Sequence, residues 1–430
     1  MPDVDQRGFD NQPAWLSAAA ACALLDVKRQ TLYAYVSRGL VRRVRGPDGA
    51  RYARDDVARL RARHDARSGH GPAAAGALRW GEPVLASAIT GIGPDGPRYR
   101  GRPAVQLAAA GVRFEAVAEL LWTDALPATP PSWPPHLPLP LGKLRALLGS
   151  SRPRDAAPPT PFSPLQLAVA ALRARDHAPY PAMLEHELAR ARALVRTLVG
   201  VAALATHPSR VEAAWSAPSI AAGTVVALGG RAEPRTVAAV EQALVLSADH
   251  ELNASSFTAR ICASAGGDLY ACVLAALATM SGPRHGGECD RFEALVAEAG
   301  EPRRARAVVA ARLQRGERLA GFGHPLYPAG DPRAAHLLDV ARRLSRTAPA
   351  PARALGRTID AVVDAVARTG ERPALDAGLV AVATAAALPS GSAGTLFALG
   401  RTAGWIAHIL EQRAEPTLLR PRAHYIGRAQ

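Results

Sequence analysis

The sequence contains almost no lysine. Lys28 and Lys143 are the only two, and arginine supplies the rest of the 52 basic residues. Together with abundant alanine, proline and glycine, this is typical of a compositional bias of the source. The formal net charge of +15 therefore does not by itself indicate binding of nucleic acid over the whole surface, although some basicity is expected if the ligands are polyanions.

Cysteine is also scarce. The four cysteines, Cys22, Cys262, Cys272 and Cys289, are scattered and form no C-x-x-C pair. A disulfide framework is characteristic of small secreted domains. In a chain of 430 residues, the sequence instead predicts reduced thiols in a cytosolic compartment.

Long apolar runs are missing as well. No run in the sequence reaches the roughly 20 residues that a membrane-spanning helix needs. The N-terminus is acidic and polar, which is unlike a signal peptide. The protein is therefore expected to be cytoplasmic, with no membrane partner, and long enough for about two or three domains with ample core.

Residues 1–68 predict a small domain of their own, with a disordered leader before Trp15. The predicted elements are a helix from Trp15 with Ser17 as N-cap, a helix over 28–38, a two-stranded turn over 40–52 and a helix over 55–67. This order resembles the winged helix-turn-helix of excisionases and of small effector-sensing transcription regulators. In those families the second helix enters the major groove of DNA, and the wing touches the backbone.

The resemblance implies DNA contacts from the second helix and the wing. The residues concerned are Lys28, Arg29, Gln30, Tyr33, Arg42 and Arg43. Between Lys28 and Arg67 there are 12 basic and 4 acidic residues, a local excess that is more informative than the global charge. The alternative is a module that has lost DNA binding and packs on the rest of the protein or mediates assembly.

From residue 69 the composition changes. Residues 69–77 are rich in glycine and alanine and predict a linker. The proline density over 127–164 excludes a continuous helix there and predicts broken helices or an ordered loop. From Leu165 onward, alanine, leucine and valine recur at helical spacing, which predicts an almost entirely α-helical body.

Four short segments, punctuated by glycine, proline or polar residues, interrupt this helical pattern. They are Ser247–Ser255 with His250, Gly282–Gly287 with His285, Gly321–Tyr327 with His324, and Pro373–Asp376. Such breaks place side chains at helix ends, where a pocket can form and backbone N–H groups are free. Taken singly, each histidine is more often a structural one, and Asp376 more often an N-cap for a helix over 377–388.

Metal binding is the first alternative for these residues. The three histidines lack any local H-x-x-x-H spacing, although a zinc site could still assemble in space. Arg333, Arg401 and Arg420 would then be unexplained. Guanidinium groups form paired hydrogen bonds with planar carboxylates, so three of them favour a small di- or tri-anion over a metal ion.

The four segments in this order resemble the citrate synthase family over about residues 78–430. The resemblance implies a mainly α, two-domain helical fold that closes over its substrates by hinge motion. The large domain would comprise 78–285 and 386–430, and the small domain 286–385. His285 would then lie at the hinge.

The resemblance assigns catalytic roles to three residues. Asp376 would remove a proton from the methyl group of acetyl-CoA, His285 would stabilise the enolate, and His324 would donate to the oxaloacetate carbonyl. A positioned base contributes about 10²–10⁴-fold, and a donor to the developing oxyanion roughly 3–4 kcal/mol. Apolar neighbours should raise the pKa of Asp376 and nearby arginines should lower it; the sequence leaves open which prevails.

The resemblance also assigns the binding residues. His250, Arg333, Arg401 and Arg420 match the residues that hold oxaloacetate, and the last usually reaches in from the partner subunit, which implies a homodimer. CoA would lie along five residues: Leu319, Ala320, Gly321, Phe322 and Gly323. No metal or other cofactor is implied, because acetyl-CoA serves as co-substrate.

Three functions are open at this stage. The first is citrate synthase of the tricarboxylic acid cycle, which condenses acetyl-CoA with oxaloacetate and hydrolyses citryl-CoA to citrate and CoA. The second is 2-methylcitrate synthase, which uses propionyl-CoA; one methylene is worth only about 1–3 kcal/mol in a pocket. The third is a DNA-binding metabolite sensor. Glu288-Cys289 stand where the family commonly has a small pair, a departure that could alter acyl-CoA preference or activity.

Overall fold

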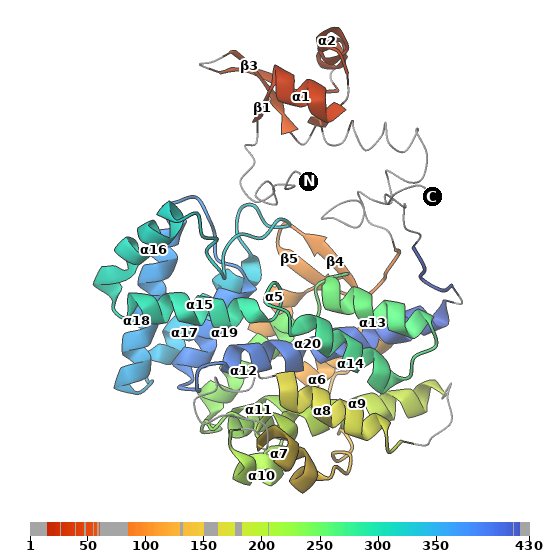
Figure 1. The fold of residues 1–430 in the computed structure, drawn as a ribbon. Coiled ribbons are helices and arrows are strands. Elements are labelled where there is room, and N and C mark those ends of the chain that lie inside the picture. The colour runs from red at the N-terminus through yellow and green to blue at the C-terminus, as the bar shows by residue number, and fades with distance from the viewer. Residues whose placement is uncertain are drawn as a thin grey trace, which may run out of the picture. The chain divides into compact units, whose positions relative to one another are not determined.

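A computed structural model describes most of the chain from Trp15 onward (Figure 1). The described residues are 15–25, 27–38, 40–46, 49–54, 56–57, 60, 85–129, 132–149, 162–176, 183–204, 206–415 and 417–421. They divide into two compact units, Met1–Ala86 and Ser87–Gln430. The predicted leader, the linker over 69–77 and most of the helix predicted over 55–67 lie outside the described residues.

The described part of the first unit combines a three-stranded antiparallel sheet with two short helices. Its elements are β1 (Trp15–Ser17), α1 (Ala18–Leu25), α2 (Arg29–Ser37), β2 (Arg43–Gly46) and β3 (Gly49–Ala53). The strand order is β1-β3-β2. Leu16, Leu32 and Tyr52 lie in its apolar core.

The start of α1 corrects one prediction and supports another. Trp15–Ser17 form a strand that pairs with β3, not the first turn of a helix. The hydroxyl of Ser17 nevertheless accepts a hydrogen bond from the backbone N–H of Ala20 at 3.2 Å. This contact satisfies one of the free N–H groups at the helix start, as an N-cap does.

The second unit opens with a small antiparallel sheet, β4 (Thr90–Gly93), β5 (Gly96–Tyr99) and β6 (Arg102–Pro103), and the other regular elements of its described residues are helices. The helices are α5 (Ala104–Ala109), α6 (Phe114–Thr123), α7 (Leu141–Gly149), α8 (Phe162–Arg173), α9 (Leu184–Ala202), η1 (Pro208–Arg210), α10 (Val211–Trp215), α11 (Ile220–Ala227), α12 (Pro234–Ser247), α13 (Ala254–Ser264), α14 (Leu269–Met280), α15 (Gly287–Ala299), η2 (Pro302–Arg304), α16 (Ala305–Gln314), α17 (Pro332–Ser345), α18 (Ala350–Ala367), α19 (Leu375–Ala385) and α20 (Ser392–Ala414). The predicted predominance of helix is confirmed. In the described part of the proline-rich stretch, helix is limited to the short α7 and the first residues of α8, in agreement with its proline content.

The 23-residue helix α20 is the core element of the second unit (Figure 1). Almost all of its residues are buried, and it packs against α12, α13, α14 and α19. Gly400 and Gly404 permit the closest approach. A Cβ on Gly400 would lie 2.8 Å from the carbonyl oxygen of Leu244, and one on Gly404 would lie 2.4 Å from that of Ala248. Glycine therefore brings the end of α12 against α20.

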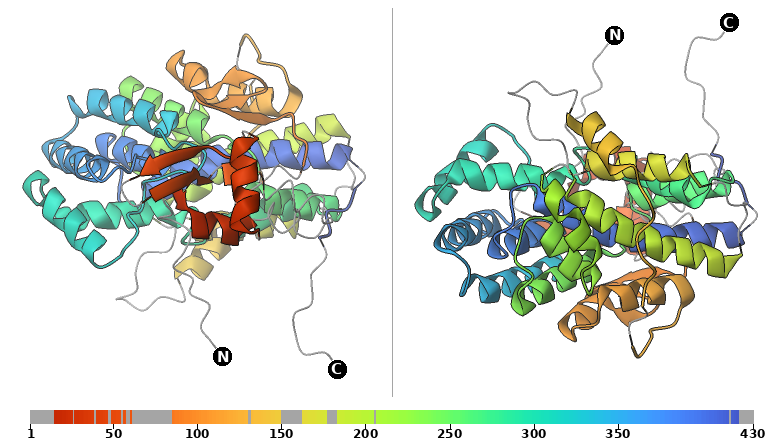
Figure 2. Two further views of the ribbon diagram at one scale, coloured as in Figure 1. Left: turned by 90° about the horizontal axis from the view of Figure 1, so that it is seen from above. Right: turned by 90° about the horizontal axis from the view of Figure 1, so that it is seen from below.

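The helices α15 to α18 gather at one end of the second unit in all views (Figures 1 and 2). The amphipathic α18 buries Ile359, Val362 and Val366 on one face, and it packs against α15, α16, α17 and α19. Within the described residues, no helix is both long and apolar enough to cross a membrane.

Candidate active site

The first predicted segment lies between α12 and α13. Glu251 adopts a left-handed conformation with φ of 55°, and the side chain of Asn253 caps α13 by accepting from the N–H of Ser256 at 3.2 Å. This turn leaves His250 buried. Its Nε2 lies 2.8 Å from the hydroxyl of Tyr327, in the third segment.

The third and fourth segments are joined by backbone hydrogen bonds. Gly323 N–H donates to the carbonyl of Arg372 at 2.9 Å, and Ala374 N–H donates to that of Gly321 at 2.8 Å. Both glycines have positive φ, and a Cβ on Gly323 would lie 2.5 Å from the carboxylate of Glu371. The backbone of the His324 segment is thus bound directly to the segment that leads into Asp376.

His324 lies close to the first segment as well. Its ring centroid is 5.1 Å from that of His250, with the two planes at 79°, and 5.0 Å from that of Tyr327. The backbone N–H of Tyr327 donates to the carbonyl of His324 at 2.8 Å. One tight turn therefore holds both His324 and the tyrosine that contacts His250.

Asp376 lies inside the first turn of α19, whose N-cap is Ala374. The alternative that Asp376 is itself an N-cap is therefore wrong. The Sγ of Cys289 donates to its Oδ1 at 3.3 Å. Burial of the carboxyl raises the pKa of Asp376 to about 6, and the charge of Glu288 adds to the rise, whereas the Cys289 contact and Arg333 oppose it.

His285 occupies the turn between α14 and α15. Its Nε2 lies 2.8 Å from the hydroxyl of Ser255, which also accepts a hydrogen bond from the indole N–H of Trp405 at 3.0 Å. The following glycine, Gly286, is required by packing, because a Cβ there would lie 2.5 Å from Phe162. These contacts fix the ring and leave Nδ1 as the nitrogen not engaged by Ser255.

All three histidines are neutral at pH 7. Burial lowers the pKa of His285 to about 3 and that of His324 to about 4, and it lowers the pKa of His250 well below the ordinary value. The charge of Arg333 further lowers the pKa of His250 and His324, and the charge of Arg401 further lowers that of His250 and His285. A neutral imidazole donates through one nitrogen and accepts through the other, so a ring can donate to a ligand without carrying charge only when its proton is on the nitrogen that faces the ligand.

Two of the predicted arginines are buried beside these rings. Arg333 forms a double hydrogen bond with Asp331 at 3.0 and 2.7 Å, and its remaining terminal nitrogen, Nη1, has no partner in the described part of the chain. Arg401 donates to the carbonyl of Ser247 at 2.8 Å, and its guanidinium lies 4.9 Å from the ring centre of Phe397. Burial lowers the pKa of Arg401 to about 10.

The charged residues of the site influence one another's pKa values. The charge of Arg401 acts on His250, His285 and Asp249, and the charge of Asp376 acts in turn on Arg401. Buried cations with unused N–H groups are costly unless an anion completes them. The arrangement can therefore bind a small anion beside three neutral donors and one basic carboxylate.

Arg420 is not placed with these residues. It lies exposed in the segment after α20 and joins none of the described site residues. The predicted CoA segment is continuous with His324: Leu319, Ala320 and Phe322 are buried, and the ring centroid of Phe322 lies 5.5 Å from that of Phe292. Gly321 is buried as well, whereas Gly323 is exposed.

The sequence did not indicate the contacts of several residues that complete the site. Ser255 and Tyr327 lie inside predicted segments and Cys289 was noted only as a departure from the family, whereas Asp331 and Trp405 were not predicted at all. The only local signal was proximity to a predicted residue, because Tyr327 follows His324 by three positions and Asp331 precedes Arg333 by two. Ser255 and Trp405 meet only through the fold.

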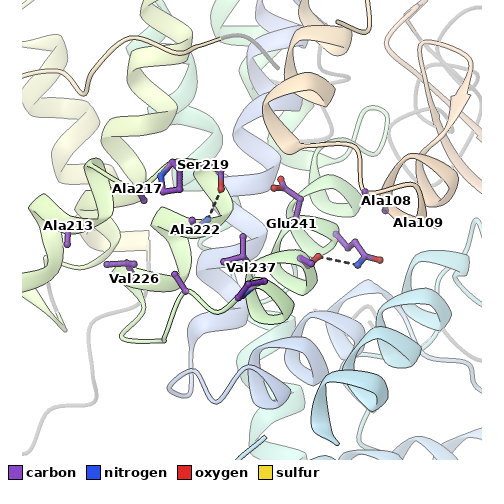
Figure 3. A pocket seen from close by; sticks show the side chains of 15 residues that line it. Ala108, Ala109, Ala213, Ala217, Ser219, Ala222, Val226, Val237 and Glu241 are labelled. Carbon is purple, nitrogen blue, oxygen red and sulfur yellow. Dashed lines mark hydrogen bonds between the residues drawn. The ribbon is translucent and has the colours of Figure 1, made fainter. Parts of the chain in front are cut away.

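The described residues hold no group of three or more His, Cys, Asp or Glu side chains that could bind a metal ion. A cavity of about 600 Å³ lies elsewhere, among α5, α11 and α12 (Figure 3). Its walls are mostly alanine and valine, with Glu241 at one side. None of the predicted site residues lines it, so it is separate from the four segments.

Comparisons with known proteins show which family this chain is similar to. A family model described as citrate synthase, C-terminal domain, matches residues 77–422. Citrate synthase 2 of Bacillus subtilis is 37% identical over 203 residues, which are 46% of this chain and 53% of that protein. A 2-methylcitrate synthase of Shewanella oneidensis is 32% identical over 192 residues, 44% of this chain and 50% of that protein. The chain spans about half the length of the curated relatives it matches.

Solved structures show the same fold. The ternary complex of carboxymethyl coenzyme A and oxaloacetate with citrate synthase from Thermoplasma acidophilum matches with a TM-score of 0.66 and 25% identity, covering 81% of this chain and 95% of that chain. The citrate synthase of Thermotoga maritima matches with a TM-score of 0.65 and 23% identity over the same shares, which shows the fold alone.

Proposed function

This chain belongs to the citrate synthase family, and we propose from that premise that it condenses acetyl-CoA with oxaloacetate and releases citrate and CoA. The observation that carries the proposal is the group of three neutral, largely buried histidines and one basic carboxylate around Arg333 and Arg401. Metal and other cofactors have no assigned part in this reaction.

Asp376 is proposed as the base that takes a proton from the acetyl-CoA methyl group. Its pKa of about 6 makes it a stronger base than an ordinary aspartate, yet it remains deprotonated at pH 7. His285 is proposed to donate from Nδ1 to the thioester oxygen as the enolate forms. This requires the tautomer in which Nε2 accepts from the Ser255 hydroxyl, so that this hydroxyl donates to His285 and not to Oδ1 of Asn253, 2.7 Å away. A neutral donor is suited to this task because an imidazolium beside Asp376 would lower the basicity of the carboxylate.

His324 is proposed to donate to the oxaloacetate carbonyl while the enolate carbon attacks it. Arg333 and Arg401 would bind the two carboxylates of oxaloacetate. His250 and its partner Tyr327 would contact the same bound oxaloacetate. The condensed thioester is then hydrolysed by water, which releases CoA. CoA itself would lie along Leu319, Ala320, Gly321, Phe322 and Gly323, of which Gly323 is exposed.

The test is oxaloacetate-dependent release of the CoA thiol, with acetyl-CoA as the acyl donor. Asp376→Asn should lower kcat by about 10²–10⁴-fold, and the matched control Asp364→Asn, at an exposed position of α18, should leave it unchanged. Equal loss in both variants, or no thiol release by the wild type, would contradict the proposal.

The choice of acyl-CoA is a second part of the same assay. A 2-methylcitrate synthase is among the relatives, so propionyl-CoA is the alternative donor. Glu288 is buried and is paired with Arg291 and Arg318, so it is not an unpaired acid in the site. The ratio of kcat/KM for the two thioesters decides between citrate and 2-methylcitrate synthesis.

The arrangement of domains is also proposed. We infer a large domain of 78–285 and 386–430 and a small domain of 286–385 that closes over the substrates, with His285 at the hinge. Closure would exclude water before the enolate forms. We further infer a cytoplasmic homodimer in which Arg420 reaches the partner's site.

A role in DNA binding is proposed for the first unit, which we interpret as a winged helix-turn-helix. Its support is that Lys28, Arg29, Gln30 and Tyr33 are exposed on or beside α2, and that Arg43 is exposed on β2. Arg42 differs from these, because its guanidinium forms a double hydrogen bond with the buried Asp56 at 2.8 and 3.2 Å. A DNA-binding sensor without catalysis and a module used only for assembly are the alternatives.

A mobility-shift assay with promoter DNA at low and raised salt tests this role. The double variant Arg29→Ala/Arg43→Ala should weaken binding and reduce the salt dependence, because lost phosphate contacts release fewer counterions. The control Arg306→Ala, on α16 in the second unit, should bind like the wild type. Absence of a shift at low salt would exclude DNA binding.

A further inference from the structure

Two cysteines that are separate in the sequence meet at the turn between α13 and α14. Cys262 lies near the end of α13, and Cys272 lies in the first turns of α14. A Cβ added to Gly267, in the turn between them, would lie 2.6 Å from the Sγ of Cys262 and 3.2 Å from that of Cys272. The two sulfurs therefore converge on the space that the glycine leaves free.

The surrounding contacts hold this turn in place. Gly267 N–H donates to the carbonyl of Cys262 at 3.0 Å, and Asp268 caps α14 by accepting from Ala271 N–H at 2.8 Å. Arg413 donates to the carbonyl of Gly267 at 3.0 Å from the end of α20. The thiols are thus close neighbours because of a fixed turn and not because of a chance rotamer.

The two thiols are not equivalent. Cys262 is partly exposed, whereas Cys272 is fully buried. A hydrogen bond from Cys272 lowers the pKa of Cys262, against the effect of burial, and the charges of Arg173 and Arg413 lower it further. The thiolate is the reactive form of cysteine, so the accessible thiol is also the more reactive one.

We propose that Cys262 and Cys272 form a peroxide-sensitive dithiol that closes reversibly to a disulfide. This inference rests on the geometry and the exposure of the two thiols and is independent of the catalytic proposal. The thiolate of Cys262 attacks a hydroperoxide and its O–O bond breaks, which gives the sulfenic acid of Cys262 and an alkoxide, or hydroxide from hydrogen peroxide. The leaving oxygen takes up the proton that the Cys262 thiol lost on ionisation, so an alcohol or water is released. The sulfur of Cys272 then attacks the sulfenic sulfur, the S–S bond forms, and the hydroxyl leaves as water with the proton of Cys272.

The experiment uses the full chain, reduced, treated with hydrogen peroxide, alkylated under denaturing conditions and digested with chymotrypsin. Chymotrypsin can cleave after Leu269 and Tyr270, whereas no Lys or Arg separates Cys262 from Cys272 and trypsin would leave both in one peptide. A linked peptide pair containing Cys262 and Cys272 should appear, about 2 Da lighter than the two reduced peptides together, and dithiothreitol should abolish it. The link should persist in Cys22→Ser, whose cysteine lies in the first unit, and be absent from Cys262→Ser and Cys272→Ser. Because the wild type alone gives the linked pair, the test does not depend on the folding of a variant.

The order of oxidation is tested separately with a sulfenic-acid probe such as dimedone. In Cys272→Ser the sulfenic acid of Cys262 cannot be resolved, so the probe should label Cys262 more strongly than in the wild type. No linked peptide in the oxidised wild type, or a link between any other two cysteines, would overturn the proposal. Stronger labelling of Cys272 in Cys262→Ser than of Cys262 in Cys272→Ser would overturn the assigned order.

Discussion

The carboxyl group of Asp376 is subject to opposing influences that the sequence alone could not weigh. Burial raises its pKa, and the charge of Glu288 raises it further, while Cys289 and Arg333 lower it. Burial prevails, and the pKa is about 6. A base tuned to just below neutral pH keeps its deprotonated form and gains driving force for removal of a carbon-bound proton.

The first prediction concerns the charge of Glu288. If Asp376 is the base, kcat/KM should rise as the pH rises through its pKa of about 6. Glu288→Gln removes a negative charge that raises this pKa, so the acid limb of the profile should move to lower pH. The control Glu298→Gln, paired with Arg312 on the outer part of α15, should leave the limb in place. An unmoved limb, or a shift to higher pH, would contradict the argument.

The second prediction concerns the hydroxyl of Tyr327. In Tyr327→Phe, Nε2 of His250 loses its partner at 2.8 Å, and one hydrogen bond is worth about 1 kcal/mol. KM for oxaloacetate should therefore rise roughly fivefold, with a smaller change in kcat. The control Tyr270→Phe removes a hydroxyl that bonds Asp176 away from the site. A fall in kcat with constant KM would instead assign Tyr327 to the chemical step.

At this scale the sequence predicted polar residues at helix breaks but not their partners. His250, His285 and His324 lie between helices as predicted, because glycine, proline and polar residues end helical runs locally. Ser255 and Trp405, 150 positions apart, meet only through packing of α13 on α20. The proximity of Cys262 to Cys272 was missed for the same reason, because the two residues do not form a C-x-x-C motif that would indicate it.

At the scale of elements, the site depends on how closely α20 approaches the end of α12. Gly404 N–H donates to the carbonyl of Ala248 at 2.9 Å, and Asp249 beside it lies 3.3 Å from the buried His408 of α20. Those contacts place the following residue, His250. The sequence shows glycine in a helical pattern, but only the fold shows which neighbour requires it.

The third prediction follows from this contact. A Cβ at position 404 would lie 2.3 Å from Oδ1 of Asp249 and 2.4 Å from the carbonyl of Ala248, so Gly404→Ala should destabilise the protein by about 1–3 kcal/mol. The control Gly142→Ala, on α7 with open space around its Cβ, should be neutral or stabilising by roughly 0.5–1 kcal/mol. Thermal unfolding of both variants checks this, and equal melting temperatures would show that α20 can shift without cost.

At the scale of the whole molecule, one chain does not bring all predicted binding residues together. Arg333 and Arg401 are buried beside the histidines, whereas Arg420 is exposed beyond the end of α20. The family resemblance predicts that this arginine serves the partner's site. Closed dimers with twofold symmetry exchange equivalent segments in both directions, so each site would contain one residue from the other chain.

The fourth prediction tests this exchange. Arg420→Ala and Asp376→Asn should each be inactive as homodimers. Coexpressed with different tags and purified through both, they form mixed dimers in which one site has its own Asp376 and the partner's Arg420. Such dimers should recover about half of the wild-type activity, because one of two equivalent sites is complete. The control is the mixed dimer of Asp376→Asn and His285→Ala. Asp376 and His285 both serve the site of their own chain, so each site of this dimer lacks one catalytic residue and no activity should be recovered. Mixed dimers without activity would place Arg420 in its own chain's site, and failure to isolate any mixed dimer would exclude the dimer itself.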